Sequence, residues 1–185
     1  MNDISARDLQ GWEYIPLGPF TAKNLGTVIS PWIVTLEALE PFRVALEKQD
    51  PVPLDYLKDP NLSSYNINLE AKIKPANCNE EEHLATSNFK YLYWSIPQQL
   101  AHHTISGCNM RPGDLLGSGT ISGTKKEEFG SLMELTWNGK QPFNTKDGER
   151  TFIKDNDEIV FYGYAVKDGM RIGFGECRSL SLIHI

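Results

Sequence analysis

Long apolar runs, an excess of positive charge and paired cysteines are all missing from this 185-residue sequence. It contains no run of 18 apolar residues, so we expect no membrane-spanning helix and no membrane partner. The 18 basic and 24 acidic side chains give a formal net charge of -6, which argues against a nucleic-acid partner. Cys78, Cys108 and Cys177 are odd in number and far apart. Their spacing excludes a zinc motif and favours reduced thiols in the cytosol.

Turn residues and short apolar runs alternate along the chain, which predicts one mainly β domain with few short helices. Residues Tyr65–Lys74 alternate apolar and polar side chains, as in a strand with one buried and one wet face. Residues 159–166 and 170–177 flank Lys167-Asp168-Gly169 and predict a hairpin. Asn138-Gly139 follows the alternating segment 132–137 and predicts a second hairpin.

Helical patterns are sparse. Residues 5–14 predict a short helix with Asp3 or Ser5 as its N-cap. Residues 87–103 predict a longer helix that is kinked or broken at Pro97.

The strongest cluster of polar side chains lies at the N-terminus. On a helix, Asp3, Arg7, Gln10 and Tyr14 would share one face. Such a face could bind a polar ligand, or a hard cation through Asp3. The alternative is a solvated helix face with an aspartate cap, and spacing alone favours that alternative.

Further candidates are scattered along the chain. Lys23 could stabilise a developing negative charge, and Thr27 could offer oxygen to an ion; the alternative for Lys23 is an ordinary exposed lysine. Residues 111–123 lack the spacing of a phosphate loop, but a strand followed by a glycine-rich loop would make Thr120 a ligand contact. Glu134 would face solvent on a strand, or need a partner if that face is buried. None of the histidines forms a convincing general base.

Several motifs together resemble the fumarylacetoacetate hydrolase family. They are NDISARDLQ at 2–10, WEYIPLGPF at 12–20, SNFKYLYW at 87–94, QQLAHH at 98–103, GCNMRPGD at 107–114, GTISG at 119–123, FGSLMEL at 129–135 and GFGEC at 173–177. The similarity runs in register over residues 1–178.

The resemblance implies a mixed β-roll or sandwich, a homodimer, and a requirement for Mg²⁺ or Ca²⁺. It also implies a cytosolic hydrolase that splits the carbon–carbon bond of 4-fumarylacetoacetate to give fumarate and acetoacetate, in tyrosine and phenylalanine catabolism. Because the family's catalytic histidine and its other acidic metal ligands belong to an N-terminal portion, we expect residues 1–179 to be a partial catalytic domain that is inactive alone. Residues 180–185 are expected to be a non-native tail.

The resemblance also implies a role for each site residue. Asp3 would be a metal ligand, with Thr27 and the Lys23 backbone near the ion. The carbonyl oxygens and the leaving carbanion would be held by Arg7, Gln10 and Lys23. The substrate would also be contacted by Gln10, Tyr14 and Thr120, and Glu134 would orient the catalytic histidine. We therefore expect Asp3, Arg7, Lys23 and Glu134 to surround one hollow. The alternatives are a related oxo-acid decarboxylase, isomerase or hydratase, and a non-catalytic dimerisation module.

Overall fold

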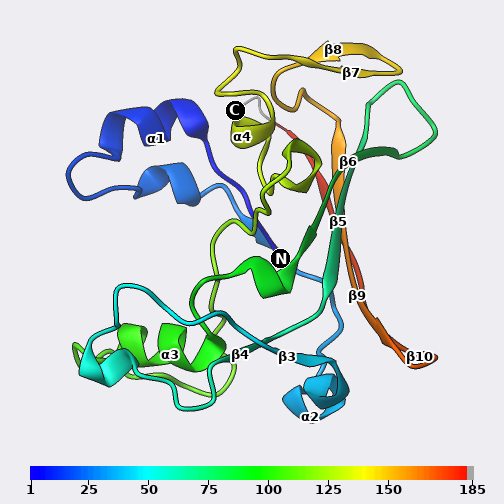
Figure 1. The fold of residues 1–185 in the computed structure, drawn as a ribbon. Helices are drawn as coiled ribbons and strands as arrows, with labels where there is room; N and C mark the ends of the chain where they lie inside the picture. The colour runs from blue at the N-terminus through cyan, green and yellow to red at the C-terminus, as the bar shows by residue number, and fades with distance from the viewer. Residues whose placement is uncertain (183–185) are drawn as a thin grey trace.

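The computed structural model describes residues 1–182, and its largest element is a four-stranded antiparallel sheet (Figure 1). The strand order is β10-β9-β5-β6. These strands are β5 (Asn68–Lys74), β6 (Glu82–Asn88), β9 (Glu158–Lys167) and β10 (Met170–Leu180). Strands from the middle of the chain thus pair with strands near its C-terminal end.

Residues 1–182 also form three small antiparallel pairs and four short α-helices, and the helices lie on one side of the main sheet in Figure 1. The pairs are β1 (Asn2–Asp3) with β2 (Thr27–Val28), β3 (Arg43–Ala45) with β4 (Ser63–Tyr65), and β7 (Phe143–Thr145) with β8 (Gly148–Arg150). The helices are α1 (Arg7–Glu13), α2 (Leu36–Leu39), α3 (Ile96–Thr104) and α4 (Leu132–Leu135). Single 3₁₀ turns are η1 (Thr21–Lys23), η2 (Glu40–Phe42), η3 (Asp55–Leu57), η4 (Phe89–Tyr91) and η5 (Lys126–Glu128). The prediction of a β-rich fold with few short helices is confirmed.

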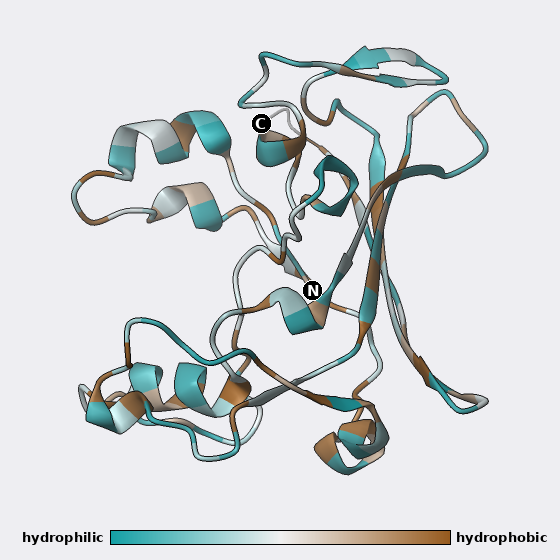
Figure 2. Ribbon diagram, viewed as in Figure 1, coloured by the Kyte–Doolittle hydropathy of each residue, from teal (hydrophilic) through white to brown (hydrophobic). Residues whose placement is uncertain are grey.

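The predicted strand over Tyr65–Lys74 is divided between β4, which ends at Tyr65, and β5, which begins at Asn68. Apolar and polar segments alternate along the main sheet (Figure 2). On the apolar side Tyr65, Ile67 and Ile73 are buried, and the first two pack in a core cluster with Leu39, Phe42 and Ala165. The opposite face is polar and partly exposed to solvent, as predicted, and its charged side chains are joined in ion pairs.

The predicted hairpin over residues 159–177 is confirmed as β9 and β10. Asp168 and Gly169 connect the strands with φ of 50° and 80°, the left-handed values that a two-residue type I′ turn requires. The pairing register shifts between Gly173 and Glu176, which marks a bulge or irregularity in the pairing of the two strands.

The longer predicted helix is wrong over its first half. Residues 87–91 belong to the end of β6 and to η4, and α3 begins only at Ile96. The side chains of Ser95 and Gln98 form a reciprocal capping box, and Pro97 lies in the first turn, where its missing N–H costs nothing. The apolar residues before residue 95, whose spacing predicted a helix, therefore belong to a strand and a 3₁₀ turn.

The segment before Asn138-Gly139 is also different from the prediction. Residues 132–135 form helix α4, capped by Ser131, in place of a hairpin strand. Trp137, Asn138 and Gly139 have φ of 50°, 56° and 79°, so the left-handed turn is present but follows a helix. The predicted strand before the loop at residues 117–123 is absent as well.

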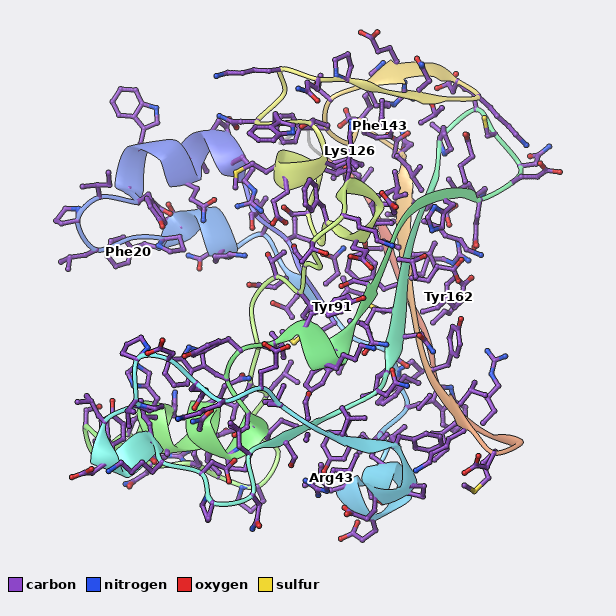
Figure 3. All side chains as sticks on the ribbon, in the orientation of Figure 1. Phe20, Arg43, Tyr91, Lys126, Phe143 and Tyr162 are labelled. Carbon is purple, nitrogen blue, oxygen red and sulfur yellow. The ribbon has the colours of Figure 1, made fainter. Side chains whose placement is uncertain are left out.

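A network of charges covers the face of the main sheet on which Tyr162 is labelled in Figure 3. Arg178 on β10 donates to the carboxylates of Glu81, Glu158 and Glu176, at 2.7 Å for Glu158 and 3.2 Å for Glu176. Lys74 on β5 pairs with Glu158 at 2.8 Å. Hydrogen bonds from Lys74 and Arg178 lower the pKa of Glu158, and Arg178 lowers the pKa of Glu176. The network ties β5, β9, β10 and the β5–β6 connection together.

The C-terminal strand ends inside the segment that was expected to be a tail. Leu180 pairs with Glu158, and the Ser181 backbone bonds with Asn156 and Asp157 at 2.7 and 2.8 Å. Residues 183–185 lie outside the described residues. Within residues 1–182 no helix is long and apolar enough to cross a membrane, and the three cysteines are free thiols.

The first stability prediction concerns the buried pair of Arg150 and Asp157, whose side chains are 1% and 0% exposed. Asp157 also accepts the backbone N–H groups of Ala76 and Lys154. Asp157→Ala should lower the free energy of unfolding in urea by about 3–5 kcal/mol, because it leaves a buried guanidinium without one partner. The matched change Glu149→Ala, at an exposed position of β8, should cost less than about 0.5 kcal/mol. Equal losses in the two variants would contradict this reading.

The second prediction uses the lowered pKa values of Glu158 and Glu176. A carboxyl whose folded pKa is depressed adds stability above its unfolded pKa, and this contribution disappears as the pH falls through the folded value. The melting temperature should therefore fall as the pH falls below about 4.5. Arg178→Gln should lower the melting temperature at pH 7 and make the acid decline shallower. A decline that is unchanged in the variant would show that the network does not cause it.

Candidate functional site

The N-terminal arm, defined as residues 1–28, carries most of the predicted site residues. Figure 1 shows α1 and the lighter-blue η1 running side by side away from the main sheet. At the root of the arm β1 pairs with β2, which places Asp3 opposite Thr27. The Ala6 N–H donates to the Ala22 carbonyl at 2.9 Å, and Ala22 is fully buried between the two segments. The arm is therefore a closed loop whose two sides are hydrogen-bonded to each other.

The root of the arm gathers Asp3, Lys23 and Thr27. The Lys23 ammonium lies 2.9 Å from Asp3 Oδ2 and also donates to the Asp3 carbonyl at 3.2 Å. The Thr27 hydroxyl donates to Asp3 Oδ1 at 3.2 Å. Lys23 thus contacts the Asp3 carboxylate through its side-chain ammonium group. Both oxygens of this carboxylate thus have a partner.

Helix α1 presents Arg7 and Gln10 together. Arg7 donates to Gln10 Oε1 at 2.7 Å, and both side chains are half-buried. Tyr14 follows at the C-cap and is 58% exposed. The predicted four-residue helix face is wrong at its first member, since Asp3 belongs to β1 and the helix is capped by Ala6 without a side-chain bond.

Glu134 on α4 forms a second cluster with two serines. The Ser122 hydroxyl lies 2.9 Å from both carboxylate oxygens, and the Ser131 hydroxyl lies 2.9 Å from Oε2. Ser122 also accepts the Gly130 N–H at 3.0 Å, which joins the glycine-rich loop to the segment before α4. A side chain at Gly130 would lie 2.9 Å from Thr120 Cγ2, so Thr120 belongs to the same neighbourhood. The carboxylate is half-buried, and two hydroxyl donors hold it in place.

One contact joins the start of the chain to the glycine-rich loop. A side chain at Gly117 would lie 3.4 Å from the Met1 methyl group, so the glycine-rich loop lies beside the start of β1. Two surface cavities, of about 640 and 180 Å³, lie elsewhere and contain none of the predicted site residues. The larger is lined by Glu40 and residues 43–45 and 61–63.

The described histidines lie away from Glu134. His83 bonds to Thr86, and His102 bonds to Tyr56 and stacks on its ring. His103 lies 3.2 Å from the Cys108 sulfur. His102 and His103 thus both have partners within the described residues. A histidine oriented by Glu134 would therefore have to come from outside residues 1–182.

The oxygen atoms at the root of the arm are of the type that binds a hard cation, but they are too few to form a complete site. Asp3 and Thr27 offer oxygen atoms, which Mg²⁺ and Ca²⁺ prefer. Such ions take about six or more oxygen ligands, and residues 1–182 contain no group of three His, Cys, Asp or Glu side chains placed to hold a metal ion. Further ligands would have to join Asp3 for a complete site.

Three residues that sequence reasoning missed hold these clusters in place. Ser131 precedes Glu134 by three residues, and this spacing is itself a helix-start pattern that could have revealed α4. Ser122 carried no such pattern. Glu13 accepts hydrogen bonds across the arm from residues 20–22, and nothing in its sequence neighbours indicated this.

Comparison with known proteins agrees with the family resemblance of the sequence motifs. The family model for the C-terminal region of fumarylacetoacetate (FAA) hydrolase matches residues 1–179. The chain is 54% identical over 177 residues to the fumarylacetoacetase of Arabidopsis thaliana and 52% identical over 178 residues to that of Homo sapiens. It is 48% identical over 185 residues to that of Dictyostelium discoideum.

These alignments cover 96–98% of this chain and 42–43% of each relative. The chain thus spans less than half the length of the curated relatives that it matches. The sequence motifs, the β-rich fold and the family match agree over residues 1–179. The chain belongs to the fumarylacetoacetate hydrolase family.

Proposed function

We propose that the protein to which this chain contributes hydrolyses the carbon–carbon bond of 4-fumarylacetoacetate. Water supplies a hydroxyl group to the carbonyl carbon of the fumaryl group, and this carbon becomes the second carboxylate carbon of fumarate. The bond to the neighbouring methylene carbon breaks, and the departing enolate takes up a proton to become acetoacetate. The observation that carries this proposal is the match over residues 1–179 to the family of that name.

Lys23, Arg7 and Gln10 would stabilise the charge of the departing enolate. Their N–H donors belong to the two sides of the closed arm, and Ala22 between those sides is fully buried. Donors that are fixed before the reaction stabilise developing charge without reorganising. Tyr14 on α1 and Thr120 on the glycine-rich loop would contact the rest of the substrate. This arrangement supports binding of an acidic diketone.

Glu134 would orient a histidine that removes a proton from the attacking water. Ser122 and Ser131 hold the carboxylate in one direction, as such an orienting group requires. Because the described histidines contact other partners, we propose that this histidine lies outside residues 1–182 and that the 185-residue chain has no activity by itself.

Asp3 would be one ligand of a Mg²⁺ or Ca²⁺ ion, with Thr27 and Lys23 in its surroundings. When bound, such an ion would polarise the carbonyl oxygens of the diketone as a Lewis acid. The exposed oxygen atoms of Asp3 and Thr27 support this assignment, because hard cations bind oxygen ligands. Carboxylates from outside this chain would complete the ligand set.

We also propose the fold, the oligomeric state, the compartment and the pathway of the whole protein. Its catalytic domain would be a mixed β-roll or sandwich, the enzyme a cytosolic homodimer, and the reaction the last step of tyrosine and phenylalanine breakdown. The free thiols support a reducing compartment, and the antiparallel sheets support the fold.

A chimera tests the proposed activity. This chain would replace the matched segment of the Arabidopsis thaliana fumarylacetoacetase, to which it is 54% identical. The chimera should convert fumarylacetoacetate to fumarate and acetoacetate, whereas the chain alone should not. Lys23→Met should lower kcat of the chimera by about 10²–10³, the effect of losing one well-aimed donor. Lys48→Met, at an exposed loop position, is the matched control and should leave kcat unchanged. Other products from the chimera, or activity of the chain alone, would overturn the proposal.

Melting of the same chimera tests the cation site. A ligand that binds only the folded state stabilises by about 2.7 kcal/mol at 100 times its Kd. Added Mg²⁺ or Ca²⁺ should therefore raise the melting temperature, and Asp3→Asn should remove most of that increase. Asp8→Asn, an exposed position of α1, removes the same charge and should preserve the increase. If the cation stabilises the chimera and its Asp3→Asn variant equally, Asp3 is not a ligand.

A further inference from the structure

Glu13, the last residue of α1, reaches across the arm to the start of η1. Its Oε1 accepts the backbone N–H groups of Phe20 and Ala22, both at 2.7 Å. Its Oε2 accepts the backbone N–H and the hydroxyl of Thr21, at 3.1 and 2.9 Å. One carboxylate thus collects four donors from three consecutive residues on the opposite side of the arm.

The contact satisfies backbone groups that would otherwise lack a partner. The first N–H groups of a helical turn have no acceptor within the turn, and their positive end attracts an anion. Phe20, Thr21 and Ala22 are these residues for η1. The connecting loop folds back closely as well, because a side chain at Gly18 would lie 2.1 Å from the Glu13 carbonyl oxygen. The two sides of the arm are therefore joined at its outer end as well as at its root.

This outer contact sits between the two groups of predicted site residues. Arg7 and Gln10 lie on α1, which Glu13 ends, and Lys23 is the last residue of η1. At the inner end of α1 the Ala6 N–H donates to the carbonyl of Ala22. With both ends fixed, α1 and η1 cannot slide past each other without breaking bonds to Glu13.

We infer that Glu13 is a positioning residue that fixes η1 against α1, and thereby sets the place of Lys23 relative to Arg7 and Gln10. The inference deepens the proposed function and rests on it for the chemical role of these three side chains. The competing explanation is that Glu13 merely closes the loop over residues 14–20, with no effect on Lys23.

The ionisation of Glu13 agrees with this geometry. Desolvation raises the pKa of the carboxyl, but the bonds from Ala22, Phe20 and Thr21 outweigh it, so the pKa lies below its ordinary value of 4.5. The groups that face the carboxylate are these backbone and hydroxyl donors, and Glu13 has no ion pair within residues 1–182. The contact should thus be complete at neutral pH and disappear as the pH falls through the lowered pKa.

The test is Glu13→Gln in the 185-residue chain, followed by NMR. The substitution replaces an acceptor oxygen by an NH₂ group, so the backbone N–H groups that share this carboxylate lose an acceptor. Hydrogen exchange at Phe20, Thr21 and Ala22 should become about tenfold faster or more, since each 1.4 kcal/mol is a factor of ten. The side-chain signals of Lys23 and Gln10 should shift at the same time. Glu47→Gln, an exposed loop position, is the matched control and should change neither.

Two results would overturn the inference. If hydrogen exchange at residues 20–22 is unchanged, the Glu13 carboxylate does not hold η1. If exchange accelerates while the Lys23 and Gln10 signals stay in place, Glu13 only closes the loop.

If Glu13→Gln does not fold, acid titration of the unchanged chain decides. The amide signals of Phe20 and Ala22 must then shift with a midpoint below pH 4.5, while the amide signal of Ala165, which is fully buried in β9 opposite Ile172, stays constant. If these amide signals do not shift, the Glu13 carboxylate does not bind residues 20–22 in solution, and the inference is wrong. All these signals report contacts inside this chain, so their outcome is independent of whether the chimera hydrolyses fumarylacetoacetate.

Discussion

The pairing of β1 with β2 is the interaction on which the candidate site depends. It brings Asp3 opposite Thr27 although they are 24 residues apart, and it allows Lys23 to reach the same carboxylate. The pair is attached to the main sheet, because Asn2 donates to Ser179 at 3.0 Å and Cys177 contacts the Val28 carbonyl at 3.1 Å. Strand β10 therefore supports the arm through Cys177 and Ser179.

The two clusters of candidate site residues are held in place by different means. The arm is fixed by backbone pairing at its root and by Glu13 at its outer end. Glu134 is fixed by hydroxyl donors from the glycine-rich loop and from the start of α4. Hydrogen bonds from fixed partners hold a charged group in one direction, which is what the stabilisation of developing charge requires. The proposed reaction divides its tasks accordingly, with charge stabilisation on the arm and orientation of a base at Glu134.

Local patterns predicted some elements well and others badly. The β9–β10 hairpin was predictable because Asp168-Gly169 determines its turn locally. Helix α4 was missed because residues 132–137 also alternate in polarity, while Ser131 and Glu134 carried the helix-start spacing. The residue types of the site were recognisable from motifs, but the Asp3–Lys23 contact depends on non-local strand pairing. The role of Glu13 had no sequence pattern, because its partners are mostly backbone N–H groups, which every residue except proline possesses.

The most direct test of the account is a crystal structure of the chimera with acetoacetate bound. The account predicts that oxygen atoms of the ligand lie within hydrogen-bonding distance of Lys23 and of Arg7 or Gln10, with Glu134 facing the same space. Acetoacetate bound instead in the cavity beside β3 and β4, with the arm uninvolved, would contradict it.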